Sequence, residues 1–249
     1  MHFVHFGPFG GSQQFAEFAN LAGGGAGSYG SCVEIEGRTR LGREGQTFAL
    51  VPVERETADA RAVFAMNPET DKHPAAVAQC TTEEDVMRCI DFGHQHALEV
   101  AVRSGNASFL GWGSCDKGIV IDLFKMKRRE VDPVRRTGLV ATGCSGAEIL
   151  TSTAQHGLAP VLGECGNVGA GVALGGGLGW LSGRYGSVSD NLLSARVITA
   201  DTRILKADSS TNEDLFWAIR GNFGVATQFE YRLHPVSEAV AGILGGLSQ

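Results

Sequence analysis

Two glycine-containing segments have the composition of loops that bind anions through their backbone. They are RSGNAS at 103–108 and GECGNVGAG at 163–171. Glycines in such loops leave successive backbone N–H groups open to a phosphate or diphosphate, and no lysine is needed. Glycine-rich loops are also common as ordinary tight turns, so neither segment alone specifies a ligand. The chain has 35 glycines, many of them at 163–186, where the backbone is expected to approach another group closely.

A Rossmann dinucleotide site is an alternative interpretation of the second segment. GAGVALG at 169–175 has a GxGxxxG spacing, and Asp190 follows at about the distance of a ribose-binding acid. A Rossmann motif should follow a buried strand, whereas PVLGECGNV precedes this one. The acid should end a second strand, but Asp190 precedes a predicted strand. The context therefore disfavours a nicotinamide-dependent dehydrogenase, which is kept as an alternative.

The chain contains VRSGNAS, GIVIDL and a run from GECGNVGAG to RVITAD, with one further segment before them and one after them. In this order, the five segments resemble the PCMH-type FAD-binding domain of the berberine-bridge-enzyme-like and vanillyl-alcohol-oxidase flavoproteins. VRSGNAS is similar to that family's pyrophosphate loop VRGGGHS, and GIVIDL is similar to the strand that follows it. The run from GECGNVGAG to RVITAD matches the second cofactor segment, and DLFWAIRGNFGVATQFEYRLHP matches the end of the domain. DARAVFAMNPETDKHPAAVAQCTTEEDV resembles its beginning. The resemblance covers residues 59–236.

The resemblance implies FAD as the cofactor and a small-molecule substrate. Hydride would pass from an alcohol, sugar or amine carbon to the flavin, and the protein would position the cofactor. Backbone amides of 104–108 and 165–169 would hold the diphosphate, three glycines would let the backbone pass close to the flavin, and the main chain near Ile198 would meet the adenine. The implied cofactor-binding residues are Arg103, Ser104, Gly105, Asn106, Ala107, Ser108, Cys165, Gly166, Val168, Gly169, Gly175, Gly176, Gly179 and Ile198. No general base and no metal ligand can be named.

The chain departs from the family pattern within these same segments. Ala107 stands where the family usually has the histidine that bonds to the flavin, and Ser104 and Asn106 replace glycines. RGNFG at 220–224 is shorter than the family's turn. Cys165 stands where bicovalent members have a flavin-bonded cysteine. A flavin-contacting role and a small buried packing thiol both remain open for it.

The sequence ends soon after the last of these motifs, although the family has a further substrate-binding domain. We therefore expect an open flavin face, which would favour self-association or a covering partner, and poor turnover by this chain alone. A non-catalytic FAD-binding module or an inactive fragment is the alternative function.

Composition limits the remaining classes of function. The net charge is −6, with no basic stripe interleaved with aromatic residues, so nucleic acid is not an expected partner. No apolar window approaches the length of a membrane span, and no signal peptide is evident, which leaves the location unknown with the cytoplasm as the default. The six cysteines have no CxxC spacing, which favours free thiols over a zinc site and leaves one or two disulfides open.

The elements that must position these loops predict an α+β fold, because helices and strands do not alternate strictly. The resemblance implies that this fold is divided into two subdomains. Thr81 and Glu84 have capping-box spacing for a helix over 82–97, Gly157 closes a helix over 147–157, and Asn212 could cap a helix over 213–219. Strands are predicted at 99–103, 118–123, 138–143, 192–200, 203–207 and 225–233. We expect a flexible segment over 1–45, an FAD-binding domain over 46–238 and a tail over 239–249.

Overall fold

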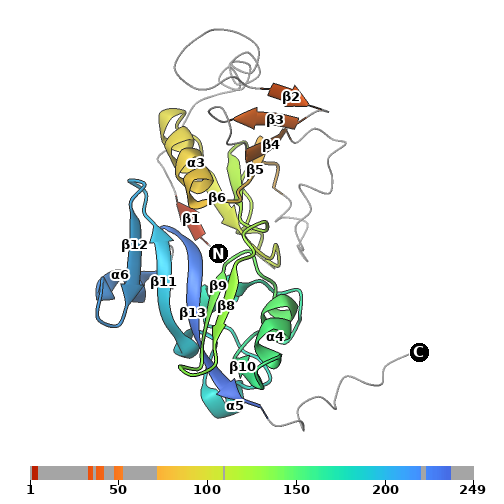
Figure 1. Cartoon of the computed structure of the whole chain (residues 1–249). Helices are drawn as coiled ribbons and strands as arrows, with labels where there is room; N and C mark the ends of the chain where they lie inside the picture. The colour runs from red at the N-terminus through yellow and green to blue at the C-terminus, as the bar shows by residue number, and fades with distance from the viewer. Residues whose placement is uncertain are drawn as a thin grey trace, which may run out of the picture.

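The computed structural model describes residues 72–108, 110–219 and 223–236, together with the backbone of four short strands before them. The described elements form two β-sheets with helices against them, the α+β class that the sequence predicts. Figure 1 shows the first sheet with helix α3 in the upper half of the view and the second sheet below it.

The first sheet has its parallel strands at the centre. Its order is β1-β6-β7-β5-β4-β3-β2. β7 pairs in parallel with both β5 and β6, and β6 and β7 are buried at every residue, as expected for VAVR and IVID covered on both faces. The strands are β1 (His2–Val4), β2 (Val33–Ile35), β3 (Arg38–Leu41), β4 (Phe48–Pro52), β5 (Ala76–Gln79), β6 (Val100–Arg103) and β7 (Ile119–Asp122).

Helix α3 (Glu83–Gln95) packs on this sheet through an apolar stripe. Val86, Cys89, Ile90 and Gly93 are buried along one face at helical spacing. Gly93 is needed for the close approach, because a Cβ there would lie 2.5 Å from Cγ2 of Val100.

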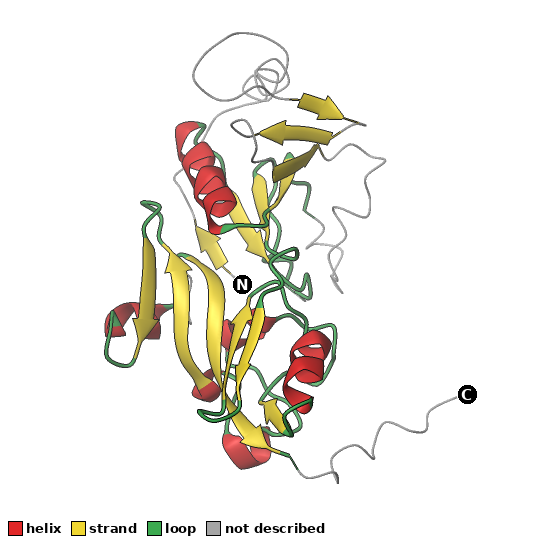
Figure 2. Cartoon of the chain, viewed as in Figure 1, coloured by secondary structure: helices red, strands yellow, loops and turns green. Residues whose placement is uncertain are grey.

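The second sheet is antiparallel, with the order β12-β11-β13-β9-β8 and β10 paired to β13. The long strand β13 alternates between buried and more exposed side chains, so one face of the sheet packs into the core. Helix α4 packs beside β8 and β10, and α6 beside β12 (Figure 2). The elements are β8 (Arg129–Asp132), β9 (Thr137–Ala141), α4 (Gly146–Ala154), β10 (Leu158–Pro160), the 3-10 turn η2 (Ala170–Gly175), α5 (Ser182–Tyr185), the 3-10 turn η3 (Ser189–Asn191), β11 (Leu192–Ile198), β12 (Ile204–Asp208), α6 (Glu213–Ala218) and β13 (Val225–Pro235).

The two sheets share core and polar contacts at their junction. Ile198 and Val225 belong to the second sheet, but both pack in the hydrophobic core under α3. Glu83, in the first turn of α3, accepts hydrogen bonds from Arg196 Nε (2.6 Å) and Thr227 Oγ1 (2.7 Å). Burial opposes ionisation of Glu83, yet these two donors lower the pKa of its carboxyl. These contacts therefore join the first sheet and α3 to strands β11 and β13 of the second sheet.

Two predicted helix caps are wrong in detail. The capping box of α3 uses Thr82 and Asp85, one residue later than predicted, with Asp85 N–H donating to Thr82 Oγ1 (3.2 Å). Asn212 has a left-handed backbone (φ 49°) and makes no capping bond; its side chain donates to the Lys206 carbonyl instead (2.7 Å). Gly157 has a positive φ (66°) beyond the end of α4, as predicted for a helix terminus.

Several expectations concern residues outside this description. Apart from β1, β2 and β3, the segment 1–45 lies outside the described residues, and so does the tail 239–249. In the described part of the chain, no helix has the length and apolar character needed to cross a membrane. Across 72–108, 110–219 and 223–236, no group of histidine, cysteine and acidic residues is arranged to hold a metal ion.

Candidate cofactor-binding site

The two glycine loops predicted from the sequence touch each other. A Cβ on Gly105 would lie 2.7 Å from Cα of Gly169, and a Cβ on Gly169 would lie 2.6 Å from N of Gly105. Real Cβ atoms do not approach so closely, so both positions require glycine for a steric reason. Ser104 adds to this contact, since its Oγ would meet a Cβ on Gly171 at 2.9 Å. The chain thus brings two distant loops into one site.

A cavity of about 430 Å³ lies where these loops meet, and it is mostly apolar. It is formed between the first sheet, the glycine segment and the start of β13. Its lining residues are Val102, Arg103, Ser104, Gly105, Asn106, Ala107, Ser108, Leu110, Trp112, Gly113, Leu123, Thr142, Val168, Gly169, Gly171, Val172, Leu174, Gly175, Gly177, Gly224, Val225 and Ala226. A mostly apolar cleft with a few polar groups is typical of a cofactor site.

The first loop is fixed at both of its ends. Arg103, the last residue of β6, forms a buried ion pair with Asp122 at the end of β7 (2.8 Å). At the other end, Ser108 is buried and its Oγ accepts a hydrogen bond from Trp112 N (3.1 Å). Between them Asn106 has a left-handed backbone (φ 56°), a conformation that asparagine tolerates better than most residues. This is the position where the resembled loop has a glycine.

The second loop is held by the start of α4 and by β13. Gly146 N and Ala147 N donate to the carbonyls of Val168 and Gly166, both at 2.8 Å. The carbonyl of Ala170 accepts from the hydroxyl of Tyr231 (3.0 Å), a fully buried side chain on β13. Burial raises the pKa of this Tyr231 hydroxyl far above its ordinary range, so it stays a hydrogen-bond donor.

Nine of the predicted site residues line the cavity. They are Arg103, Ser104, Gly105, Asn106, Ala107, Ser108, Val168, Gly169 and Gly175. Five others do not line it. Gly179 is required by packing, since a Cβ there would collide with the carbonyl of Leu162. Ile198 is buried in the core between the sheets, and its carbonyl lies against Gly224, which does line the cavity. Cys165, Gly166 and Gly176 are the remaining three.

Residues outside the predicted set complete the lining. Gly171, Gly177, Gly224 and Val225 belong to the glycine-rich and RGNFGVA segments, so the sequence carried a signal for them. Leu110, Trp112 and Thr142 had none, because only the folded chain brings them beside the loops.

The Rossmann interpretation is wrong for this segment. GAGVALG does not join a strand to an α-helix; it forms the 3-10 turn η2, and the preceding strand β10 ends at Pro160. Asp190 lies in η3 and accepts hydrogen bonds from Ser187 N (2.8 Å) and Ser187 Oγ (2.7 Å). Its carboxylate therefore closes a local turn.

Cys165 differs from the other described cysteines. Cys80, Cys89, Cys115 and Cys144 are buried, whereas Cys165 is exposed, so the interpretation of Cys165 as a buried packing thiol is wrong. Burial also raises the pKa of Cys115 to about 12, which makes that thiol unreactive near neutral pH.

We expect iodoacetamide to modify Cys165 in the native protein while these four buried cysteines stay unmodified, as peptide mass spectrometry would show. Denatured protein, in which all of them should react, is the control. Modification of the buried thiols at the rate of Cys165 would contradict the described packing.

Comparison with known proteins agrees with this architecture. A family model described as "FAD binding domain" matches residues 74–208. The FAD-linked oxidoreductase pgmH of Aspergillus terreus is 39% identical over 178 residues, which cover 70% of this chain and 36% of that protein. The crystal structure of 6-hydroxy-D-nicotine oxidase from Arthrobacter nicotinovorans is similar with a TM-score of 0.70 and 31% identity, over 75% of this chain and 42% of that one.

A second solved structure gives the same picture. The berberine-bridge-enzyme-like protein 1 of Physcomitrella patens has a TM-score of 0.70 and 29% identity, again over 75% of this chain and 42% of that one. The chain spans 36 to 42% of the length of these relatives. Because the family match includes both loops and the strands that carry them, this chain belongs to the FAD binding domain family and has the PCMH-type fold of the berberine-bridge-enzyme-like and vanillyl-alcohol-oxidase flavoproteins.

Proposed function

We propose that the cavity between the two glycine loops binds FAD, within a domain that spans residues 46–238. The observation that carries this proposal is the contact of Gly105 with Gly169, which makes one cavity from two loops. The lining fits a flavin dinucleotide in character. It is mainly apolar, and among the described lining residues the one basic side chain, Arg103, is held by Asp122, so backbone amides would bind the diphosphate.

Bound FAD would accept a hydride from the carbon of a small alcohol, sugar or amine. The residues of this chain would hold the diphosphate at 103–108 and 168–169 and shield one side of the cofactor with Val172, Leu174 and Trp112. Ala107 lines the cavity and cannot bond to the flavin, so the cofactor is not attached at this position. One similar solved structure is named as an oxidase, 6-hydroxy-D-nicotine oxidase, and this supports an oxidation of this class.

Anaerobic reduction of the bound flavin tests this function. The purified chain is loaded with FAD and mixed with a panel of alcohols, sugars and amines, while the flavin absorption is followed. We expect at least one compound to bleach it. Flavin that dithionite reduces but no member of the panel reduces would favour the alternative, a non-catalytic FAD-binding module.

Asn106→Asp should weaken FAD binding by about tenfold or more, because a carboxylate would face the diphosphate. Fluorescence titration of FAD measures the change. Asn212→Asp is the matched control, since Asn212 also has a left-handed backbone but lies before α6 and does not line the cavity. FAD affinity unaffected by Asn106→Asp would place the diphosphate elsewhere.

A further inference from the structure

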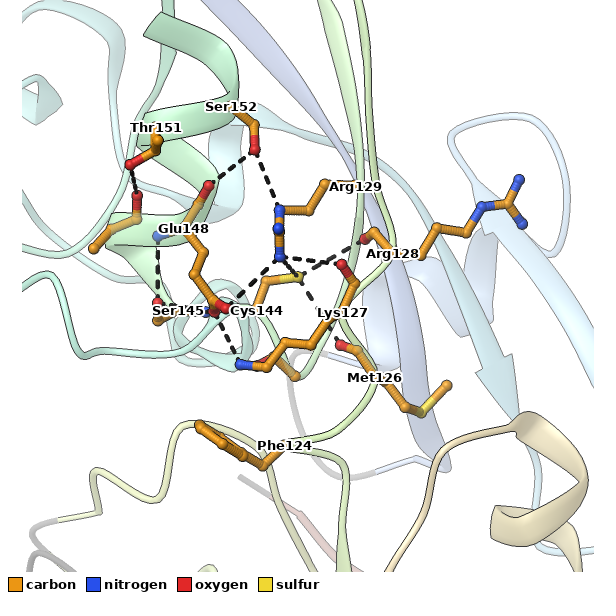
Figure 3. A network of polar contacts seen from close by, with 12 residues as sticks. Phe124, Met126, Lys127, Arg128, Arg129, Cys144, Ser145, Glu148, Thr151 and Ser152 are labelled. Atoms are coloured by element: carbon orange, nitrogen blue, oxygen red, sulfur yellow. Dashed lines mark hydrogen bonds and ion pairs between the residues drawn. The ribbon is translucent and has the colours of Figure 1, made fainter.

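Glu148 is the centre of a polar network that lies outside the cavity. Its Oε2 accepts hydrogen bonds from Ser145 N (2.8 Å), Ser145 Oγ (3.0 Å) and Lys127 Nζ (2.9 Å). Arg129 lies 3.7 Å from its Oε1. Figure 3 shows these side chains converging at the start of α4. Desolvation opposes ionisation, but the Ser145 and Lys127 donors lower the pKa of Glu148 to about 2, so it is charged at neutral pH.

This network fixes the chain that leads into α4. Glu148 N donates back to Ser145 Oγ (3.3 Å), which completes a capping box with Ser145. Lys127 also donates to the Gly143 carbonyl (2.8 Å), and its ammonium lies 3.8 Å from the centre of the Phe124 ring. Both the carboxylate and the ammonium therefore act on the same short segment, 143–148.

That segment in turn holds the second glycine loop. Gly146 N and Ala147 N bind the loop carbonyls of Val168 and Gly166, as described above. Ser145 forms an isolated β-bridge with Gly169, and Ala170 N donates to the Cys144 carbonyl (3.0 Å). Backbone hydrogen bonds and one β-bridge thus connect residues 166–170 to residues 144–147. Gly169 is also the residue that contacts Gly105 in the first loop.

We infer that Glu148 is a positioning residue for the cofactor: it holds 144–147 in place, and these residues hold the loop 166–170 in the form that lines the cavity. Glu148 and Lys127 do not line the cavity themselves. The inference rests on the proposed function for its FAD part. The effect of Glu148 on the order of the loop 166–170 can be measured without any cofactor.

Glu148→Ala is the main test, and Glu148→Gln is the conservative variant, because glutamine can also serve in a capping box. We expect Glu148→Ala to weaken FAD binding by about tenfold, and Glu148→Gln by less. In the FAD-free protein, hydrogen exchange of peptides covering 163–174 should be faster in Glu148→Ala than in wild type.

Asp85→Ala is the matched control, because Asp85 has the same capping-box role in α3, where Asp85 Oδ2 accepts from Thr81 N and Thr82 N, both at 2.9 Å. It should lower the thermal unfolding temperature yet change FAD affinity by less than about threefold. Equal loss of affinity in Asp85→Ala and Glu148→Ala, or unchanged exchange at 163–174, would overturn the inference. If wild type bound no FAD, the proposed function would fail, while the exchange data would still decide whether Glu148 holds the loop.

Discussion

Gly105→Ala is expected to weaken FAD binding by about ten- to hundredfold, because the new Cβ forces the two loops apart at a cost of about 1–3 kcal/mol. The atoms it would meet are backbone atoms of Gly169, with Cα at 2.7 Å, and a backbone cannot move aside as the end of a flexible side chain can. Gly105 does not have a positive φ, so the effect is steric and not conformational. Gly169→Ala should behave in the same way, since it meets Gly105 at 2.6 Å.

Two other glycines make the result interpretable. Gly183→Ala in α5 is the matched control, because a Cβ there meets nothing within 4 Å and the residue does not line the cavity. Gly175 also has free space around its Cβ, but it does line the cavity. Gly175→Ala should therefore leave the thermal stability of the FAD-free protein unchanged and still weaken FAD. Equal FAD affinities for Gly105→Ala and Gly183→Ala would refute the two-loop site.

Arg103→Met is expected to destabilise the fold by about 3–5 kcal/mol, because it leaves the Asp122 carboxylate buried without its cationic partner. Both side chains of this pair are about 6 to 7% exposed. Asp122 also accepts from Phe124 N (2.9 Å), so its charge orders the chain after β7 as well. Urea unfolding followed by circular dichroism measures the change in free energy of unfolding.

Arg128→Met provides the comparison for that loss. Arg128 pairs with Glu130 at 2.6 Å, but these side chains are 68% and 53% exposed. Solvent screens such a pair, so its removal should cost at most about 1 kcal/mol. The double variant Arg103→Met with Asp122→Leu should recover much of the stability, because no buried charge remains. A loss below about 1 kcal/mol in Arg103→Met would mean that water reaches Asp122.

Local patterns in the sequence predicted most elements near the site, because their signals lie within short windows. The apolar spacing after Thr82 predicted α3, and the apolar run at 119–121 within GIVIDL predicted a buried strand. The helix cap was misplaced by one residue, since both Thr81 and Thr82 have an acidic residue three positions later. The short strands β8 and β10 had no distinct pattern and depend on pairing with β9 and β13.

Contacts between distant segments set the limit on predicting the site. Both loops were identified from their residues, but their contact at Gly105 and Gly169 depends on the packing of α4, η2 and β6. The main chain near Ile198 was expected to meet the adenine, which stays a prediction, while its side chain fills the core between the sheets, as a β-branched residue on a buried strand can. Trp112 reaches the cavity only through the fold of the loop after β6.

Equilibrium dialysis of the purified chain against FAD and against NAD tests the central claim most directly. The cavity between the glycine loops should retain FAD in clear preference to NAD, and Gly105→Ala should retain much less FAD than wild type while Gly183→Ala retains as much. NAD bound as tightly as FAD, or FAD retained equally by Gly105→Ala, would contradict the account.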